Sequence, residues 1–320
     1  MVSVLKKDYS KYYCCFFIFF ICSSTVVGYG PKPFPKKVCR VLFIGNSITY
    51  SGQYITDIEA YLTVHYPKRH FEFINVGLPS ETVSGLSEDN HAGGKFPRPD
   101  LHERLERVLA QTKPDFIFAC YGMNDGIYLP LDEVRFRKFR EGINWLHARI
   151  EQIGKPIVHL TPPIFDDIKG KNVGYGAVLD VYSEWLLSRR DSLKWEVADL
   201  HFPMKTYLED QRKVKPDFAL AKDGVHPDAL GHWIMAKQVL IYLGEKGLEG
   251  VEDVKTTLAF HPNGEAILKL VSERQQIMKD AWLTSTKHQR PEMKVGLPLQ
   301  EAKAKSAEIE KQLRKLIKTK

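Results

Sequence analysis

The chain has 320 residues, of which 43% are apolar, so it is long enough for one α/β domain with a sizeable core and an appendage. Its 46 Lys and Arg residues exceed its 39 Asp and Glu residues, which gives a net charge of +7. These charges are spread along the chain. Because no single basic stripe could follow a phosphate backbone, we expect no nucleic-acid partner.

The first thirty residues have the order of a secretory signal peptide. A basic start, MVSVLKKDYSKYY, is followed by the apolar run CCFFIFFICSSTVV and then by the small residues of Gly28-Tyr29-Gly30. This order predicts that residues 1–30 are removed and that the protein is exported, either periplasmic or secreted. The apolar run is shorter than the about 20 residues that a permanent spanning helix needs, so removal is favoured and an uncleaved N-terminal membrane anchor is the alternative.

Two of the five cysteines remain after removal of such a signal. Cys39 and Cys120 fall on neighbouring predicted strands, about four residues or ~13 Å out of step at about 3.3 Å per residue. A disulfide needs Cα atoms within about 7 Å. We therefore expect two free, buried thiols.

Short apolar runs alternate with longer helical patterns between residues 38 and 245. The runs are too short for helices and are rich in Val, Ile and Phe, which predicts five strands. They are Val41 to Ile44, Phe71 to Val76, Phe116 to Ala119, Ile157 to Leu160, and Trp195 to Leu200.

Four segments between these runs have apolar residues at three- and four-residue spacing, as amphipathic helices do. They are Tyr54 to Tyr66, Leu101 to Ala110, Asp132 to Ile153, and Tyr175 to Arg190. Alternation of strand and helix predicts right-handed crossovers and a parallel sheet with helices on both faces. The fold class is therefore α/β, with one domain over residues 38–245.

Residues 246–320 contain no convincing strand and are predicted to form a helical extension. In the last helix Ala302, Ser306, Ile309, Leu313 and Leu316 recur at four- and three-residue spacing. This stripe is either a docking face, with packing on its own domain as the simpler possibility, or a short coiled coil through which the protein self-associates.

Unusual residues follow the predicted strands, at the edge of a parallel sheet where ligands gather. The first strand runs into Gly45-Asn46-Ser47, the second into Asn75-Val76-Gly77, and the third into Tyr121 to Asp125. A further motif, Asp223-Gly224-Val225-His226-Pro227, precedes the last helix of the domain.

These residues can fill every role of an acyl-transfer site. Ser47 is the candidate nucleophile, His226 the base, and Asp223 the carboxylate that orients the imidazole. The candidate oxyanion donors are the backbone N–H groups of Ser47 and Gly77 and the side-chain amide of Asn124. An isolated turn serine, Asp-Gly pair or helix-start histidine is usually structural, but their shared position at one edge favours catalysis.

The chain resembles the SGNH hydrolases, also called GDSL-type esterases and lipases. GNSIT, NVGLPSET, GMND and DGVHP match the four sequence blocks of that superfamily, in order. The resemblance implies a three-layer α/β/α fold with flavodoxin-like strand order, metal-free ester hydrolysis through an acyl-enzyme, and no cofactor. Two positions need weighing: Asn46 replaces the usual aspartate, and Asp125 could compete with Asp223 as the acid partner.

Other residues near the blocks could contact substrate. Tyr50 and Tyr121 neighbour the first and third blocks, and His91 lies in the long loop from Ser87 to Leu105, which could line a cleft. Packing is the simpler reading of the two tyrosines. The histidines show no metal-binding spacing, so we expect no metal site.

The sequence thus predicts an exported serine esterase whose substrate is a small-molecule or glycan ester. Deacetylation of a carbohydrate is the preferred reaction, with lipase, lysophospholipase or thioesterase activity as the alternative within the superfamily. Two other classes remain: a flavodoxin-like flavin protein, and a non-catalytic glycan-binding pseudo-enzyme in which Asn46 has disabled the serine turn.

Overall fold

A computed structural model describes residues 33–318 of the chain. Five strands form one parallel sheet in the order β2-β1-β3-β4-β5, the flavodoxin-like order that the family resemblance implied. They are β1 (Arg40–Gly45), β2 (Glu72–Asn75), β3 (Phe116–Cys120), β4 (Ile157–Leu160) and β5 (Glu196–Ala198). All five were predicted to within two residues at either end, which confirms the α/β assignment.

The central strands are buried on both faces. Every residue of β3 and β4 is buried, as are all residues of β1 after Arg40. Strands covered by helices on both sides read as continuous apolar runs, because neither face meets water. This explains why the runs, rather than an alternating pattern, located the strands.

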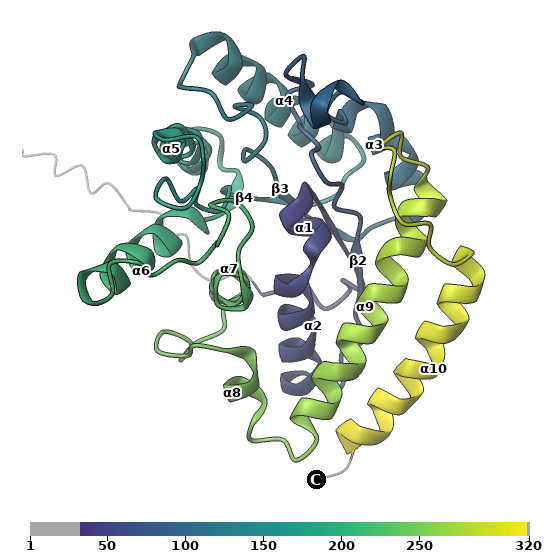
Figure 1. Cartoon of the computed structure of the whole chain (residues 1–320). Helices are drawn as coiled ribbons and strands as arrows, with labels where there is room; N and C mark the ends of the chain where they lie inside the picture. Colours follow the sequence, from purple (N-terminus) through teal and green to yellow (C-terminus); the bar gives the residue numbers. More distant parts are fainter. Residues whose placement is uncertain (1–32, 319–320) are drawn as a thin grey trace, which may run out of the picture. The chain divides into compact units, whose positions relative to one another are not determined.

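Helices pack on both sides of the sheet (Figure 1). On one side α2 packs beside α7. The Glu106–Arg149 ion pair joins α3 to α4, and the stacked rings of Phe139 and Tyr182 join α4 to α5. The helices of the domain are α1 (Ser47–Ser51), α2 (Gln53–His65), α3 (Leu101–Thr112), α4 (Glu133–Gln152), α5 (Tyr175–Leu193), α6 (His201–Val214) and α7 (Ala229–Tyr242), with the short 3₁₀ helix η1 at His91–Gly94.

Two of these helices were not expected from the sequence. Helix α1 replaces the polar turn after β1, and Asn46 caps it by accepting the N–H of Ile48 at 3.1 Å. Helix α6 is mostly polar and buries only His201, Met204 and Leu208. A helix with so narrow an apolar face gives little periodic signal.

The C-terminal extension belongs to the same compact unit as the sheet. It consists of α8 (Val254–Leu258), α9 (Gly264–Thr286) and α10 (Leu299–Lys318). Helix α9 packs against α2 and β2, and α10 lies beside α9 (Figure 1). The apolar stripe of α10 is used within the chain, since Ala302, Ile309 and Leu313 are buried.

Helix α9 is joined to the domain by buried polar contacts. Arg274 Nη2 lies 2.7 Å from Glu59 Oε1, and Gln275 Nε2 donates to Glu59 Oε2 at 2.6 Å. The same amide of Gln275 donates to the backbone oxygen of Phe73 in β2 at 3.0 Å. Since β2 is the outermost strand, α9 covers a free edge of the sheet.

The two cysteines of the described chain are free thiols. In the parallel register Cys120 pairs with Gly45, six positions after Cys39, which is further out of step than expected. Cys120 is buried, but Cys39 is exposed, contrary to expectation, because it precedes β1 at the open end of the sheet.

Within residues 33–318 no helix has the length and apolar content needed to cross a membrane. The predicted signal peptide, residues 1–30, lies outside the described residues.

Candidate active site

Two segments bring the candidate catalytic residues together. Ser47 is the first residue of α1, directly after β1, and Asp223 and His226 lie in the loop before α7. Ser47 Oγ is 2.8 Å from His226 Nε2, although the two residues are 179 positions apart. His226 Nδ1 is in turn 2.7 Å from Asp223 Oδ2.

Asp223 is held by its own loop. Its Oδ1 accepts the backbone N–H of His226 at 2.8 Å and that of Val225 at 2.9 Å. Partial burial opposes ionisation of this carboxyl, but the two N–H groups and the imidazole outweigh it, so the pKa of Asp223 is lowered. An ionised Asp223 accepts a hydrogen bond from the Nδ1–H group of His226 and leaves Nε2 unprotonated, ready to take a proton from Ser47.

The site is open to solvent. The side chains of His226 and Asp223 are 50% and 57% exposed, and Ser47 is half-buried. A large hydrated substrate can therefore reach the serine hydroxyl without displacing a covering segment.

Backbone contacts fix the histidine loop. Gly224 has a φ of +83°, which favours glycine, and its carbonyl oxygen accepts the N–H of Asp166 at 2.9 Å. Asp166 is paired with Arg212 at 2.6 Å, and Arg212 Nε also donates to the backbone oxygen of Phe218. Helix α6, which sequence reasoning missed, supplies that arginine and so supports the loop that carries His226.

The backbone of Gly77 serves a different purpose from the one expected. Its N–H donates to Asn75 Oδ1 at 2.9 Å. A Cβ at this position would lie 2.3 Å from the backbone nitrogen of Tyr50, so glycine is needed for the close approach of α1 rather than of substrate. The structure therefore gives the proposed Gly77 donor another acceptor.

Ser80, three residues later, has features that the sequence did not reveal. Its φ of +68° is unusual for a serine. It is half-buried, and its N–H has no acceptor among residues 33–318. A positive φ at a non-glycine residue often marks a functional site. No sequence pattern distinguishes such a serine from an ordinary turn serine.

Asn124 is buried and oriented by two neighbours. Its Oδ1 accepts the hydroxyl of Tyr128 at 3.0 Å, and its Nδ2 donates to the backbone oxygen of Glu81 at 3.1 Å. These bonds fix which end of the amide is the donor. One hydrogen of Nδ2 remains for another acceptor.

Asp125 has a structural position. It is fully buried and accepts the backbone N–H groups of Val83, Ser84 and Gly122 at 2.8 to 2.9 Å. Burial raises the pKa of this carboxyl. It joins the segment after β2 to the segment after β3, so it does not compete with Asp223 for the imidazole.

The three candidate substrate contacts have different positions. Tyr50 is half-buried, three residues after Ser47 on α1, and the ammonium of Lys279 from α9 lies 4.0 Å from its ring centroid. Burial, reinforced by the charge of Asp280, raises the pKa of Tyr50.

His91 makes its contacts within its own loop: Nδ1 lies 3.1 Å from Glu88 Oε1, and the ring packs edge-on against Phe96. A substrate contact for Tyr121 was wrong, because this side chain is 1% exposed and its hydroxyl donates to Glu81 at 2.6 Å.

Over the part of the chain that the structure describes, no group of three or more His, Cys, Asp or Glu side chains is arranged to hold a metal ion.

The fold and this site define a hydrolase of the SGNH type. The GDSL-like lipase/acylhydrolase family model matches residues 43–234, more than half of the chain, so the protein belongs to that family and is an ester-hydrolysing enzyme. The match ends within α7 and does not include α8 to α10.

Individual relatives are distant in sequence. An acetylxylan esterase of Geobacillus stearothermophilus is 23% identical over 232 residues, which cover 64% of this chain and 94% of that protein. Among solved structures, LAE5, an alpha/beta hydrolase from the metagenome of Lake Arreo, Spain, has a TM-score of 0.51 at 22% identity, covering 68% of this chain and 97% of its own.

BT4096, a gut microbial diltiazem-metabolizing enzyme, has a TM-score of 0.55 at 21% identity and covers 68% of this chain. This chain spans about half of BT4096, 49% of its length. At these identities the solved structures establish the fold, including the sheet that positions the site.

Proposed function

We propose that this protein is an exported carbohydrate esterase that removes acetyl groups through a Ser47–His226–Asp223 acyl-enzyme mechanism. The observation that carries the proposal is the 2.8 Å contact between Ser47 Oγ and His226 Nε2, with Asp223 bonded to the other ring nitrogen. Nucleophile, base and orienting carboxylate are thus within bonding reach of one another.

The reaction proceeds in two halves. Ser47 Oγ attacks the ester carbonyl while Nε2 of His226 takes its proton, and the imidazolium formed is stabilised by Asp223. The tetrahedral intermediate collapses as His226 protonates the departing sugar hydroxyl. Water, deprotonated by His226, then attacks the acyl-serine and releases acetate.

The developing oxyanion needs preorganised donors. We assign this role to the N–H of Ser47, the free hydrogen of Asn124 Nδ2, and the N–H of Ser80. Ser80 replaces Gly77 in this assignment, because the Gly77 N–H is bonded to Asn75 and the Ser80 N–H has no acceptor among the described residues.

Two observations support an acetylated carbohydrate as substrate. The exposed catalytic side chains suit a bulky, hydrated polymer, and a relative that is matched over 94% of its own length is an acetylxylan esterase. Export is proposed from the composition of residues 1–30. Mass spectrometry of protein recovered from the periplasm or medium tests whether those residues are removed.

The proposal is tested by labelling and by turnover. A fluorophosphonate should form an adduct at Ser47 that is absent from Ser47→Ala, and acetylated xylo-oligosaccharides and p-nitrophenyl acetate should be hydrolysed. Hydrolysis of p-nitrophenyl palmitate without turnover of any acetyl ester would instead indicate a lipase.

The alternatives from other classes have less support. The chain belongs to an acylhydrolase family, which argues against the hypothesis of a flavin-binding protein. The pseudo-enzyme required Asn46 to disable the serine turn, yet the Asn46 side chain caps α1 and Ser47 lies within bonding distance of His226. Sugar binding without any labelling of Ser47 would favour the pseudo-enzyme.

A further inference from the structure

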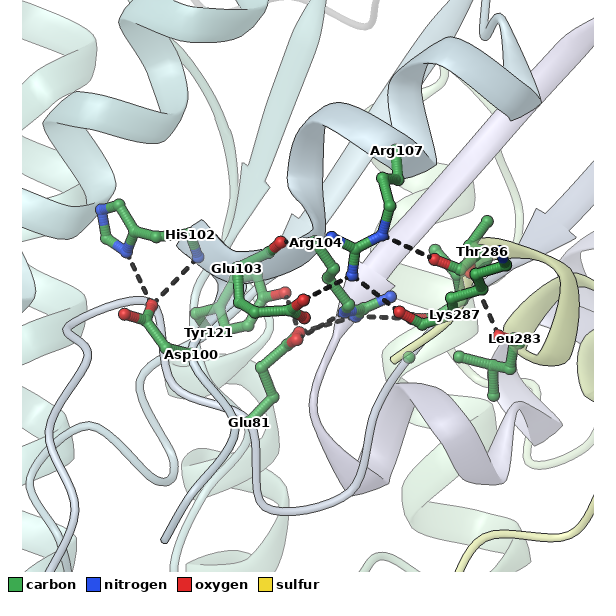
Figure 2. A network of polar contacts seen from close by, with 12 residues as sticks. Glu81, Asp100, His102, Glu103, Arg104, Arg107, Tyr121, Leu283, Thr286 and Lys287 are labelled. Atoms are coloured by element: carbon green, nitrogen blue, oxygen red, sulfur yellow. Dashed lines mark hydrogen bonds and ion pairs between the residues drawn. The ribbon is translucent and has the colours of Figure 1, made fainter. Parts of the chain in front are cut away.

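A buried ion pair lies beneath the segment that follows β2. Arg104, on α3, binds Glu81 through two bonds, Nε to Oε1 at 2.5 Å and Nη2 to Oε2 at 2.7 Å (Figure 2). Tyr121, directly after β3, donates its hydroxyl to Glu81 Oε2 at 2.6 Å. All three side chains are at most 1% exposed.

Such a pair is a poor source of stability by itself. Removing two charges from water costs about as much as their attraction returns, and apolar residues often replace such pairs without loss. In addition, Arg104 Nη1 is buried without a hydrogen-bond partner among residues 33–318. Burial lowers the pKa of Arg104, but the Glu81 carboxylate more than offsets this, so the pKa is raised and the guanidinium stays charged.

The pair spans the turn that carries Ser80. Besides Glu81, Arg104 Nη2 donates to the backbone oxygen of Val76 at 2.8 Å. One guanidinium therefore holds both ends of the segment from Val76 to Glu81. Within it, the N–H of Glu81 donates to the oxygen of Leu78 at 3.1 Å, and Ser80 adopts its positive φ.

The pair also controls Asn124. The backbone oxygen of Glu81 accepts one hydrogen of Asn124 Nδ2 at 3.1 Å. Because the Glu81 side chain is fixed by Arg104 and Tyr121, its carbonyl is a fixed acceptor, and the second hydrogen of Nδ2 has one direction only. Two of the three proposed oxyanion donors thus depend on the position of Glu81.

We propose that Arg104 and Glu81 are positioning residues of the oxyanion hole, which hold the Ser80 N–H and the Asn124 amide in place. This inference rests on the proposed esterase function. Neither side chain touches substrate; the pair sets the geometry of donors that act only on the transition state, so its loss lowers kcat more than it raises KM.

The C-terminal extension also contacts α3, the helix that carries Arg104. Arg107, one turn after Arg104 on α3, donates to the backbone oxygens of Thr286 and Lys287 at 3.1 and 2.7 Å (Figure 2). These are the last residue of α9 and the residue that follows it. The arginine that holds the turn is therefore on a helix anchored by the extension.

The test uses Glu81→Gln and Arg104→Lys in the full-length mature protein, with Tyr121→Phe as a milder variant that keeps the ion pair. Glu59→Gln is the matched control, since it disturbs the largely buried Glu59–Arg274 pair, which makes no contact with the proposed donors. Each variant is assayed for kcat and KM with p-nitrophenyl acetate, for the pH profile of kcat/KM, and for inhibition by butylboronic acid. This inhibitor forms a tetrahedral adduct with an active serine.

We expect kcat to fall about 10- to 100-fold in Glu81→Gln and Arg104→Lys, which is less than the loss of a whole donor, about 10² to 10³. The inhibition constant of butylboronic acid should rise by the same factor as kcat/KM falls. The pH profile should keep its wild-type midpoint, because the triad is untouched. In Tyr121→Phe kcat should fall about 3- to 10-fold, because one hydrogen bond to Glu81 is lost while the ion pair remains. Glu59→Gln should lower the stability of the protein without lowering kcat per folded molecule.

The inference is overturned if folded Glu81→Gln retains wild-type kcat. It is also overturned if the loss comes with a shifted pH midpoint or an unchanged boronate constant, or if Glu59→Gln loses kcat equally. Should Glu81→Gln and Arg104→Lys not fold, an unchanged kcat in Tyr121→Phe refutes it. A wild-type protein that neither hydrolyses acetyl esters nor binds the boronate refutes the proposed function itself.

Discussion

Replacement of Asp223 by asparagine separates the charge of this residue from its shape. The two backbone N–H groups bonded to Oδ1 can keep an oxygen acceptor in Asp223→Asn. The amide NH₂ group then occupies the place of Oδ2 and faces His226 Nδ1. Two donors cannot share that contact, so the ring places its proton on Nε2 and can no longer accept one from Ser47.

The expected loss of rate in Asp223→Asn has a lower and an upper limit. In a serine-protease triad this change costs about 10⁴ in kcat, or ~5.5 kcal/mol at about 1.36 kcal/mol per decade. A flip of the introduced amide would restore the acceptor for Nδ1, but it would break two backbone bonds worth about 1 to 1.5 kcal/mol each. That route costs about 2 to 3 kcal/mol, which sets a floor near 10². We therefore expect a 10²- to 10⁴-fold loss.

The assay is kcat/KM with p-nitrophenyl acetate, with circular dichroism to confirm folding. Asp228→Asn is the control, because it makes the same chemical change in the same loop. Asp228 caps α7 by accepting the N–H of Gly231, a role that asparagine fills equally well. If Asp223→Asn keeps more than about a tenth of wild-type kcat/KM, Asp223 does not set the imidazole tautomer and the mechanism needs another carboxylate.

Three further predictions concern other parts of the molecule. Burial raises the pKa of Asp57 from 3.8 to about 7, so the folded state binds a proton that the unfolded state has lost; stability should fall as pH rises from about 4 to about 7, and urea titrations of Asp57→Asn should lack this slope. A thiol reagent should modify exposed Cys39 in folded protein produced without residues 1–30, whereas Cys120, whose pKa burial raises to about 12, should react only in denaturant; equal reaction of both would contradict the fold. Asn124→Ala should lower kcat by about 10² to 10³, and a change below about tenfold would remove its amide from the oxyanion hole.

The sheet was predictable because its signal is local. Strands such as β3 and β4 are continuous apolar runs between polar segments, and chain order alone then brings residues that follow parallel strands to one edge. Ser47 could be placed at this edge in this way, whereas Asp223 and His226 precede α7 and were grouped with it by their chemistry and by the family resemblance. Their catalytic role remains a prediction that the proposed experiments test.

What the sequence could not provide depends on backbone conformation and burial. The Gly77 N–H was predicted as an oxyanion donor because glycine lets a substrate approach the backbone closely. The group that approaches Gly77 is instead α1, and the residue with the unusual positive φ is Ser80. Tyr121 was a candidate substrate contact because it neighbours the third block, but its side chain is buried in the core, as the simpler interpretation had it. Such distinctions depend on tertiary packing, which periodicity does not encode.

The packing of α9 along the edge strand β2 limits how copies of this protein can associate. An uncovered outer strand offers a row of backbone donors and acceptors to any extended chain, and is a common starting point for unwanted pairing between molecules. Here α9 lies along that strand, and the amide of Gln275 occupies the Phe73 carbonyl. Growth of the sheet by a neighbour's strand is thus blocked on this side, so an oligomer that uses this side would have to form through helix surfaces.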